Sequence, residues 1–442
     1  MENDYLCTIM DIKRLYDIFL RHPQVTTDSR DCPEGSIFFA LKGETFDGNK
    51  FAKSALEKGC AYAVIDNADY APEGDHRFIV VDDGLGALQA LARHHRRTLG
   101  IPIVGITGTN GKTTTKELVA AVLSKRYNTL YTQGNFNNPI GVPKTLLRLT
   151  AEHEMAVVEM GASHPGDIKE LVEIAEPDYG IITNVGKAHL QGFGSFEGVI
   201  RTKCELYDFL RDHGKHTVFI DGGNEHLMPM AYGLEQVRYG VGERAGQVVS
   251  GALGPCAPYL TFDWWQQDGR RHHVDTHLIG SYNIYNMLAA ATIGRYFGVT
   301  AEQIDKALAD YVPSNNRSQL SETPHNHLVI DAYNANPTSM AAAIANFSVM
   351  AVERKMAILG DMGELGPTSL EEHQKVVDML KGTDIDNVWL VGEQFGKTDC
   401  SFRKFADVEV VKTAIADEQP QGHYILLKGS NYMHLYELPP LL

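Results

Sequence analysis

The sequence predicts an α/β protein whose three domains are each built on a largely parallel β-sheet. The chain has 442 residues, which favours about two to four domains of ordinary size. Short apolar runs alternate with helical patterns along the chain, and this alternation is typical of parallel sheets covered by helices. We expect the domains to span residues 1–98, 99–312 and 313–442.

The first block, residues 1–98, alternates short strands with helices. Its expected elements are strands at Ile37–Leu41 and Ala63–Asp66 and helices at Phe51–Gly59 and Leu85–Leu99. Gly100 and Pro102 interrupt the helical pattern directly after the last of these helices. The first domain boundary is placed at this break.

The second block, residues 99–312, opens with the apolar run Ile103–Ile106, which predicts a buried strand. Further strands are expected at Ala156–Val158, Gly180–Thr183 and Val218–Ile220. A Gly-rich, β-like stretch at about 237–279 predicts a small antiparallel insertion. A helix at Asn283–Phe297, ended by Gly298, is expected after it.

The third block, residues 313–442, consists of strand–loop–helix units. Its strands are expected at Leu328–Asp331, Met356–Leu359, Val388–Val391 and Tyr424–Leu427. This order predicts a compact, doubly wound, Rossmann-like domain.

Composition excludes several classes of protein. A formal net charge of −16 argues against nucleic acid as a partner, because phosphate backbones require a basic surface. No apolar run is long enough to span a bilayer, and the acidic start Met1–Asp4 does not resemble a secretory signal. The six cysteines are scattered without a C-x-x-C pair, as in reduced proteins. We therefore expect a cytoplasmic protein without membrane insertion, and we expect it to be a monomer.

The most informative segment is G-T-N-G-K-T-T-T at 108–115, between an expected strand and the helical pattern Glu117–Lys125. Strand, glycine loop and helix are the context of a phosphate-binding loop, whose N–H groups and helix dipole face phosphate oxygens. In such a loop Lys112 reaches the β- and γ-phosphates and the Thr113 hydroxyl ligates Mg²⁺. The residues expected to contact nucleotide phosphates are Gly108, Thr109, Asn110, Gly111, Lys112, Thr113 and Thr114.

The spacing of this loop departs from the usual pattern, because Ile106 stands where the first glycine would be. The alternative is a Gly-rich turn that caps a helix. That alternative does not account for Lys-Thr directly after the glycine.

Three single residues follow predicted strands or lie on predicted helices near this loop. Glu159 ends a strand, where a carboxylate can ligate Mg²⁺, although a solvated strand-end glutamate is the simpler alternative. His189, in T-N-V-G-K-A-H-L, also follows a strand and is a candidate metal ligand or a structural histidine. Lys203 lies on the helical pattern Phe196–Leu210, and its spacing alone favours an ordinary surface lysine.

Asparagines mark two further candidate binding segments. Asn283 and Asn286 share a helix face, where they could contact a base or a phosphate, or could with Ser281 form an N-terminal cap. The segment D-A-Y-N-A-N-P at 331–337 suits recognition of a polar ligand at a strand end, or is a turn rich in Asn and Pro. Lys428-Gly429-Ser430 is a similar donor-rich turn.

Together these motifs resemble the Mur ligase family of peptidoglycan synthesis over essentially the whole chain. G-T-N-G-K-T-T-T, V-E-M-G at 158–161 and T-N-V-G-K-A-H-L at 183–190 are similar to the central ATPase domain of that family. D-A-Y-N-A-N-P-T-S-M at 331–340 and L-G-D-M-G-E-L-G at 359–366 are similar to its MurF type. The resemblance implies an N-terminal uridine-nucleotide-binding domain, a central P-loop ATPase-like domain and a C-terminal Rossmann-like domain.

The resemblance also implies roles for the candidate catalytic residues. Lys112 and Thr113 would hold the triphosphate of ATP and the first Mg²⁺, and Glu159 would ligate that same region. His189 would ligate a second Mg²⁺. Lys203 matches a lysine that the family carries as a carbamate, which reverses its interpretation as a surface residue.

Substrate-binding residues are implied in each domain. T-D-S-R at 27–30 and A-L-K-G-E-T-F-D-G-N at 40–49 look like the uridine-binding motifs of the family, with Ser29, Arg30 and Lys42 as the expected contacts. In G-N-F-N-N-P, either Asn135 or Asn138 would lie near the substrate and the γ-phosphate.

The remaining implied contacts concern ATP and the incoming dipeptide. Asn283 and Asn286 would lie at the adenine side, and Arg317 and Asp331 would close over phosphate and ribose. The residues expected near the dipeptide are Tyr333, Asn334 and Asn336.

Four positions depart from the family pattern. Tyr282 and Asn49 stand where the family usually has His, Asn316 where it has Gly, and Asn431 where it often has Arg. None of these changes removes an expected metal or phosphate contact. They affect adenine, uridine and interdomain contacts.

The resemblance implies an ATP-dependent ligase that adds D-alanyl-D-alanine to UDP-N-acetylmuramoyl-tripeptide through an acyl phosphate. Three alternatives remain: a sister Mur ligase that adds one amino acid, a folate polyglutamate synthetase, and a nucleotide-binding regulator without catalysis. The sequence leaves open whether residue three of the substrate peptide is diaminopimelate or lysine.

Overall fold

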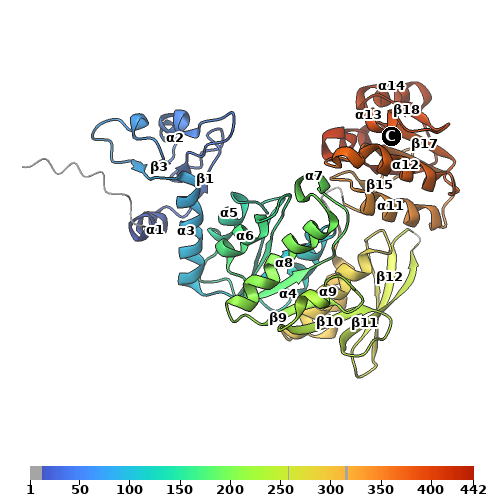
Figure 1. The fold of residues 1–442 in the computed structure, drawn as a ribbon, viewed down its shortest axis with the longest axis horizontal. Coiled ribbons are helices and arrows are strands. Elements are labelled where there is room, and N and C mark those ends of the chain that lie inside the picture. Colours follow the sequence, from blue (N-terminus) through green and yellow to red (C-terminus); the bar gives the residue numbers. More distant parts are fainter. Residues whose placement is uncertain (1–11, 257, 314–316) are drawn as a thin grey trace, which may run out of the picture. The chain divides into compact units, whose positions relative to one another are not determined.

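The computed structural model describes residues 12–256, 258–313 and 317–442 (Figure 1). Two compact units are distinguished: one comprises Met1–Gly105, Asn128–Met160 and Glu170–Asp178, and the other comprises the remaining segments up to Leu442. Asn316, one of the four departures noted above, and Cys7 lie outside the described residues. The strands form three sheets, so the predicted α/β class with three sheet-based domains is confirmed.

The N-terminal sheet has four parallel strands in the order β1-β2-β3-β4. They are β1 (Val25–Thr26), β2 (Ile37–Phe39), β3 (Tyr62–Ile65) and β4 (Phe78–Val80), with helices α1 (Ile12–Arg21), α2 (Ala52–Glu57) and α3 (Gly84–Leu99). Asp83 caps α3 by accepting a hydrogen bond from Leu85 N–H, and Gly100 ends it with φ 64°. The predicted helix end at Gly100 is therefore confirmed, because a left-handed residue after the last turn favours glycine.

The largest sheet has nine strands in the order β13-β12-β11-β10-β9-β8-β5-β7-β6. They are β5 (Ile103–Thr107), β6 (Thr129–Tyr131), β7 (Met155–Glu159), β8 (Tyr179–Ile182), β9 (Thr217–Asp221), β10 (Glu235–Val241), β11 (Gln247–Cys256), β12 (Leu260–Trp265) and β13 (Arg271–Asp275). β12 is antiparallel to both of its neighbours, β11 and β13, as expected for 237–279. They do not form a separate insertion, since β10 pairs with both β9 and β11 and so extends the same sheet.

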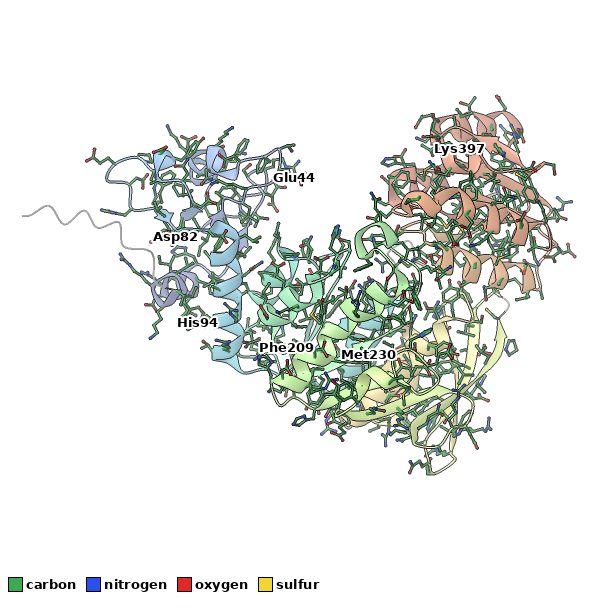
Figure 2. The ribbon with its side chains drawn as sticks, viewed as in Figure 1. Glu44, Asp82, His94, Phe209, Met230 and Lys397 are labelled. Atoms are coloured by element: carbon green, nitrogen blue, oxygen red, sulfur yellow. The ribbon has the colours of Figure 1, made fainter. Side chains whose placement is uncertain are left out.

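Seven helices lie between or after the strands of this sheet in the described part of the sequence. They are α4 (Lys112–Leu123), α5 (Gly141–Leu146), α6 (Asp167–Ala175), α7 (Leu190–Phe193), α8 (Phe196–Asp212), α9 (Asn283–Tyr296) and α10 (Ala301–Asp310). α9 packs against α4 and against β10 and β11. α8 presents Phe209, which Figure 2 labels, as part of its buried face.

The C-terminal sheet has six strands in the order β14-β15-β19-β16-β17-β18 and is parallel except for β14. They are β14 (Gln319–Glu322), β15 (His327–Asp331), β16 (Lys355–Gly360), β17 (Asn387–Val391), β18 (Arg403–Phe405) and β19 (Tyr424–Lys428), with helices α11 (Pro337–Val349), α12 (Ser369–Leu380), α13 (Glu393–Gly396) and α14 (Val408–Glu418). Consecutive strand residues enter opposite cores: Ile358 packs in the cluster that includes α14, and Leu359 packs in the cluster that includes α11 and α12. Helices therefore cover both faces, and the predicted doubly wound domain is confirmed.

Among the described residues, no helix combines the length and apolar character that crossing a bilayer requires.

Candidate nucleotide and metal site

The segment 108–111 links β5 to α4, so the predicted order of strand, glycine loop and helix is confirmed. Two of its glycines have conformations that other residues rarely adopt, with φ 145° at Gly108 and φ 76° at Gly111. A Cβ on Gly108 would lie 2.0 Å from Thr183 Oγ1, and one on Gly111 would lie 2.6 Å from Asn286 Oδ1. Both positions therefore require glycine.

Hydrogen bonds from the segment after β8 hold this loop. Asn110 N–H donates to Asn184 Oδ1 (3.0 Å), while Asn110 O accepts from Asn184 Nδ2 (2.9 Å) and from Thr183 Oγ1 (2.6 Å). The Lys112 ammonium donates to two loop carbonyls, Gly108 O at 2.8 Å and Thr109 O at 3.1 Å. The loop is thus rigidly supported, with a positive charge over it and the N-terminus of a 12-residue helix behind it.

Glu159 is the last residue of β7 and is 1% exposed. Its Oε1 accepts a hydrogen bond from Asn137 Nδ2 (2.9 Å), and its backbone N–H donates to Thr132 Oγ1 (3.0 Å). The alternative of a solvated strand-end glutamate is therefore wrong. Asn137 was missed from the sequence, although it lies between the two asparagines singled out in G-N-F-N-N-P. Of those two, Asn138 accepts from Ile140 N–H and Gly141 N–H at the start of α5.

His189 precedes the short helix α7 in a left-handed conformation, with φ 50°. Its Nδ1 is paired with the carboxylate of Glu364. The hydrogen bond from His189 lowers the pKa of the Glu364 carboxyl. Glu364 belongs to the L-G-D-M-G-E-L-G segment but was not identified as a candidate from the sequence, because only the folded chain brings it to His189.

Lys203 lies on α8 and is 2% exposed, so its interpretation as a surface lysine is wrong. Its Nζ lies 3.4 Å from Ala162 O and 5.3 Å from the centre of the Phe193 ring. Burial, and then the charge of Lys112, lower the pKa of Lys203 well below its ordinary value. Burial thus favours the neutral amine over the ammonium more than it would at an exposed lysine.

The two asparagines of α9 connect this helix to α4. Asn286 Nδ2 donates to Asn283 Oδ1 (2.8 Å), Asn283 Nδ2 donates to Ile279 O (2.7 Å), and Asn286 Oδ1 accepts from Thr115 Oγ1 (3.0 Å). Both are buried. The N-cap position of α9 is Tyr282, whose side chain makes no capping hydrogen bond. The alternative that these asparagines form an N-terminal cap with Ser281 is therefore wrong.

The segment 331–337 follows β15, as expected. Lys428 Nζ donates to Asp331 Oδ2 (2.6 Å) and to Asn334 O (3.3 Å), which joins the two donor-rich turns noted in the sequence. The Arg317 guanidinium lies 4.0 Å from the centre of the Tyr333 ring. Asn336 caps α11 by accepting from Ser339 N–H (2.9 Å).

In the N-terminal domain the candidate uridine contacts pair with charged neighbours. Arg30 forms an exposed ion pair with Asp28 (2.7 Å), and Lys42 pairs with Asp66 (2.8 Å). Ser29 O accepts from Lys58 Nζ (2.6 Å).

Asn49, which replaces a common His, is buried and fully engaged. Its Nδ2 donates to Asp47 Oδ1 and to Asp66 Oδ1, both at 2.7 Å, and its Oδ1 accepts from Asp66 N–H. An amide supplies these two donors and one acceptor together, whereas an imidazole has two ring nitrogens.

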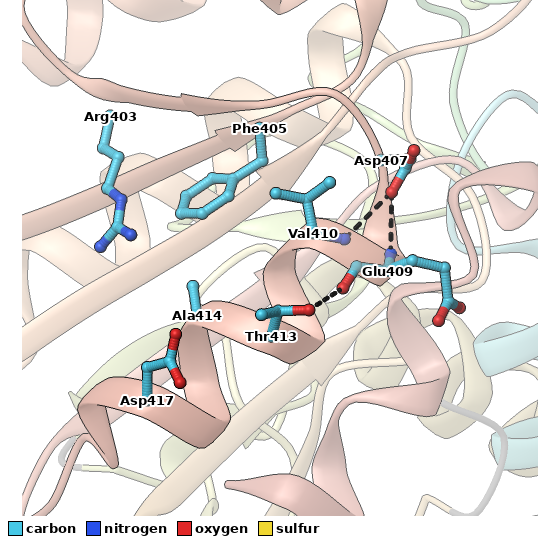
Figure 3. Close-up of a pocket in the computed structure, with 8 residues that line it drawn as sticks. All are labelled: Arg403, Phe405, Asp407, Glu409, Val410, Thr413, Ala414 and Asp417. Carbon is cyan, nitrogen blue, oxygen red and sulfur yellow. Dashed lines mark hydrogen bonds between the residues drawn. The ribbon is translucent and has the colours of Figure 1, made fainter.

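Figure 3 shows a pocket on the C-terminal domain between β18 and α14. Its lining includes Arg403, Phe405 and Asp417 but none of the candidate site residues. This pocket is therefore not the candidate site.

The glycine loop, the sheet that carries it and the two further α/β domains define the class of protein. The chain is a three-domain α/β protein built around a nucleotide-binding loop. Family models place the chain more narrowly. "Mur ligase family, catalytic domain" matches residues 23–96, "Mur ligase middle domain" matches 106–294, and "Mur ligase, glutamate ligase domain" matches 316–431. The chain belongs to the Mur ligase family, and its high-coverage relatives are of the MurF type.

Curated relatives extend over nearly the whole chain. The UDP-N-acetylmuramoyl-tripeptide--D-alanyl-D-alanine ligase of Bacillus subtilis is 34% identical, with 98% of this chain and 97% of that protein covered. The enzyme of the same name from Escherichia coli is also 34% identical, covering 94% and 92%.

Solved structures agree in fold. MurF from Acinetobacter baumannii matches with a TM-score of 0.82 at 30% identity, covering 94% of this chain and 92% of that one. MurF from Thermotoga maritima in complex with ADP matches with a TM-score of 0.83 at 25% identity, covering 95% and 96%. A folylpolyglutamate synthase from the same organism shares only the fold, at 12% identity and 78% coverage of this chain.

Proposed function

We propose that this chain is the ATP-dependent ligase that joins D-alanyl-D-alanine to UDP-N-acetylmuramoyl-tripeptide in the cytoplasm, with release of ADP and phosphate. The observation that carries the proposal is the similarity, over 98% of the chain, to a ligase of this name. We assign residues 1–98 to the UDP substrate, 99–312 to ATP and catalysis, and 313–442 to the dipeptide and to closure.

The chemistry follows from the groups involved. A carboxylate is a poor acyl donor, so transfer of the γ-phosphoryl group first converts it to an acyl phosphate. The free amine of the dipeptide then attacks the carbonyl carbon, and the tetrahedral intermediate expels phosphate to leave an amide. Lys112 and the N–H groups of the loop hold the phosphates and stabilise the charge that develops on them. Water must be excluded, because it would hydrolyse the acyl phosphate.

Oxygen donors on this chain fit Mg²⁺. The Thr113 hydroxyl and the Glu159 carboxylate are ligand types that Mg²⁺ prefers, and Mg²⁺ usually takes its remaining ligands from water and substrate phosphates. In the part of the chain that the structure describes, no three His, Cys, Asp or Glu side chains are arranged as a metal site. When bound, Mg²⁺ would neutralise negative charge on the triphosphate of ATP. His189, paired with Glu364, is proposed as a ligand of a second ion.

Lys203 is proposed to carry a carbamate. A neutral amine adds to carbon dioxide, forming one N–C bond and releasing one proton, whereas an ammonium cannot. The burial of Lys203 and the lowered pKa of its ammonium favour the neutral form. The carbamate would replace a nitrogen that suits Mg²⁺ poorly with oxygens that suit it well.

The test is phosphate release from MgATP in the presence of UDP-N-acetylmuramoyl-tripeptide, with and without D-alanyl-D-alanine. The proposal expects release that requires both substrates. Release with a single amino acid but not with the dipeptide would instead indicate a sister Mur ligase. Absence of phosphate release with any of these acceptors would support the non-catalytic regulator.

A further inference from the structure

One side-chain hydrogen bond joins the first turn of α11 to the phosphate loop. Asn336 Nδ2 donates to Asn110 Oδ1 at 2.8 Å, although the two residues are 226 positions apart in sequence. Asn336 is 8% exposed and Asn110 is half-buried, so the bond is partly buried.

The other hydrogen bonds of Asn336 fix the orientation of its amide. Its Oδ1 accepts from Ser339 N–H (2.9 Å), and its own N–H donates to Ser339 Oγ (3.1 Å), which together form a capping box. Because the oxygen caps the helix, the amide nitrogen is the atom that faces Asn110.

Further contacts join the first turn of α11 to residues 183–186, the segment that supports the phosphate loop. Thr109 Oγ1 accepts from Gly186 N–H (3.0 Å), and a Cβ on Gly186 would lie 3.0 Å from Thr338 Oγ1. The first turn of α11 thus lies directly against 183–186, which also holds the backbone of Asn110. Asn110 is bonded on its backbone by the central domain and on its side chain by the C-terminal domain.

We propose that Asn336 is a positioning residue for ATP: it clamps the phosphate loop through Asn110 and so couples the nucleotide site to the segment assigned to the dipeptide. This role replaces the expectation that Asn336 contacts the dipeptide itself. It rests on the proposed function only for the statement that the neighbouring segment binds D-alanyl-D-alanine. Because the bond holds the Asn110 side chain in one orientation, it preorganises the loop, and its loss weakens nucleotide binding.

Asn336→Ser is the informative variant, because serine is a good N-cap but is too short to reach Asn110. The probe is MgADP, with the Kd measured by isothermal titration calorimetry on the full chain. Loss of one partly buried hydrogen bond is expected to raise the Kd about threefold to tenfold. The KM for ATP should rise with it, while the KM for D-alanyl-D-alanine stays nearly unchanged.

A matched control is available in the same domain. Asp407 caps α14 by accepting from Glu409 N–H (3.0 Å) and Val410 N–H (3.1 Å), as drawn in Figure 3. Asp407→Ser changes a helix cap in the same way but has no bond to the phosphate loop, so the Kd for MgADP should not change.

Asn110→Ser completes a double-mutant cycle. If the two side chains act through their shared bond, Asn336→Ser has little further effect once Asn110 is changed. Should Asn336→Ser fold poorly, Asn336→Asp keeps the cap and places a negative charge beside the loop, and it should weaken MgADP binding as well.

Wild-type MgADP affinity in Asn336→Ser, or fully additive effects with Asn110→Ser, would overturn the proposal. A rise in the KM for the dipeptide alone would return Asn336 to a dipeptide contact and overturn it too. Failure of the proposed function is separate: a chain that does not use D-alanyl-D-alanine would still show the MgADP effect.

Discussion

Lys203 is 2% exposed, and burial lowers the pKa of its ammonium. A charge in this position is unfavourable, which favours the neutral amine. Its Nζ donates a long hydrogen bond to a backbone carbonyl, Ala162 O, at 3.4 Å. The environment therefore suits chemistry at this nitrogen better than a structural ion pair.

Lys203→Met retains the apolar stem and most of the volume while removing the amine. Turnover is expected to fall on the order of 100-fold or more, since a group that organises charge at the transferred phosphoryl is lost. Thermal unfolding should change little. Wild-type protein in ¹³C-bicarbonate should show a carbamate carbon signal by NMR that the variant lacks.

Lys355 offers the control for this prediction, because it is a buried lysine of the C-terminal domain that pairs with Asp384 at 2.9 Å. Lys355→Met should lower stability without abolishing turnover. Near-normal turnover in Lys203→Met would contradict the role assigned to Lys203.

At the scale of elements, the phosphate loop depends on glycines more than on any side chain. Gly108→Ala would force its Cβ to 2.0 Å from Thr183 Oγ1 at a φ of 145°, so either the loop or the segment after β8 must move. We expect the Kd of this variant for MgADP to rise about 100-fold, because backbone strain and misplaced loop N–H groups both weaken binding.

Gly396→Ala is the comparison, since a Cβ there meets no atom within 4 Å. Calorimetric titration with MgADP measures both. Equal affinity in the two variants would mean that the loop conformation does not govern nucleotide binding.

Local signals made most elements predictable. Buried runs such as 155–158 are apolar throughout, and Gly100 ends α3 where the pattern stops. The way β10 extends the central sheet was not predictable, because pairing between strands depends on contacts distant in sequence. The short edge strand β18 lacks a long apolar run and was missed.

The residues of the candidate site were predictable where a local motif marks them and not where a contact joins distant parts of the sequence. The phosphate loop and Glu159 could be identified from local motifs, whereas the Asn137–Glu159 and His189–Glu364 contacts could not. The burial of Lys203 was indicated only by family resemblance, because its helical spacing resembles that of a surface residue.

At the scale of the whole molecule, the reaction requires that water be kept from the acyl phosphate. We expect the C-terminal domain to close over the central domain when substrates are bound, as lids and domains do in many enzymes. The radius of gyration measured by small-angle scattering should therefore fall on addition of a non-hydrolysable ATP analogue with UDP-N-acetylmuramoyl-tripeptide. Identical scattering with and without these ligands would argue for a fixed arrangement.

The most direct test of the central claim is the mass of the reaction product. After incubation with MgATP, UDP-N-acetylmuramoyl-tripeptide and D-alanyl-D-alanine, the nucleotide substrate should gain the mass of the dipeptide less one water, with one ADP formed per product. A product heavier by a single amino acid residue, or an unchanged substrate despite ATP hydrolysis, would contradict the assignment.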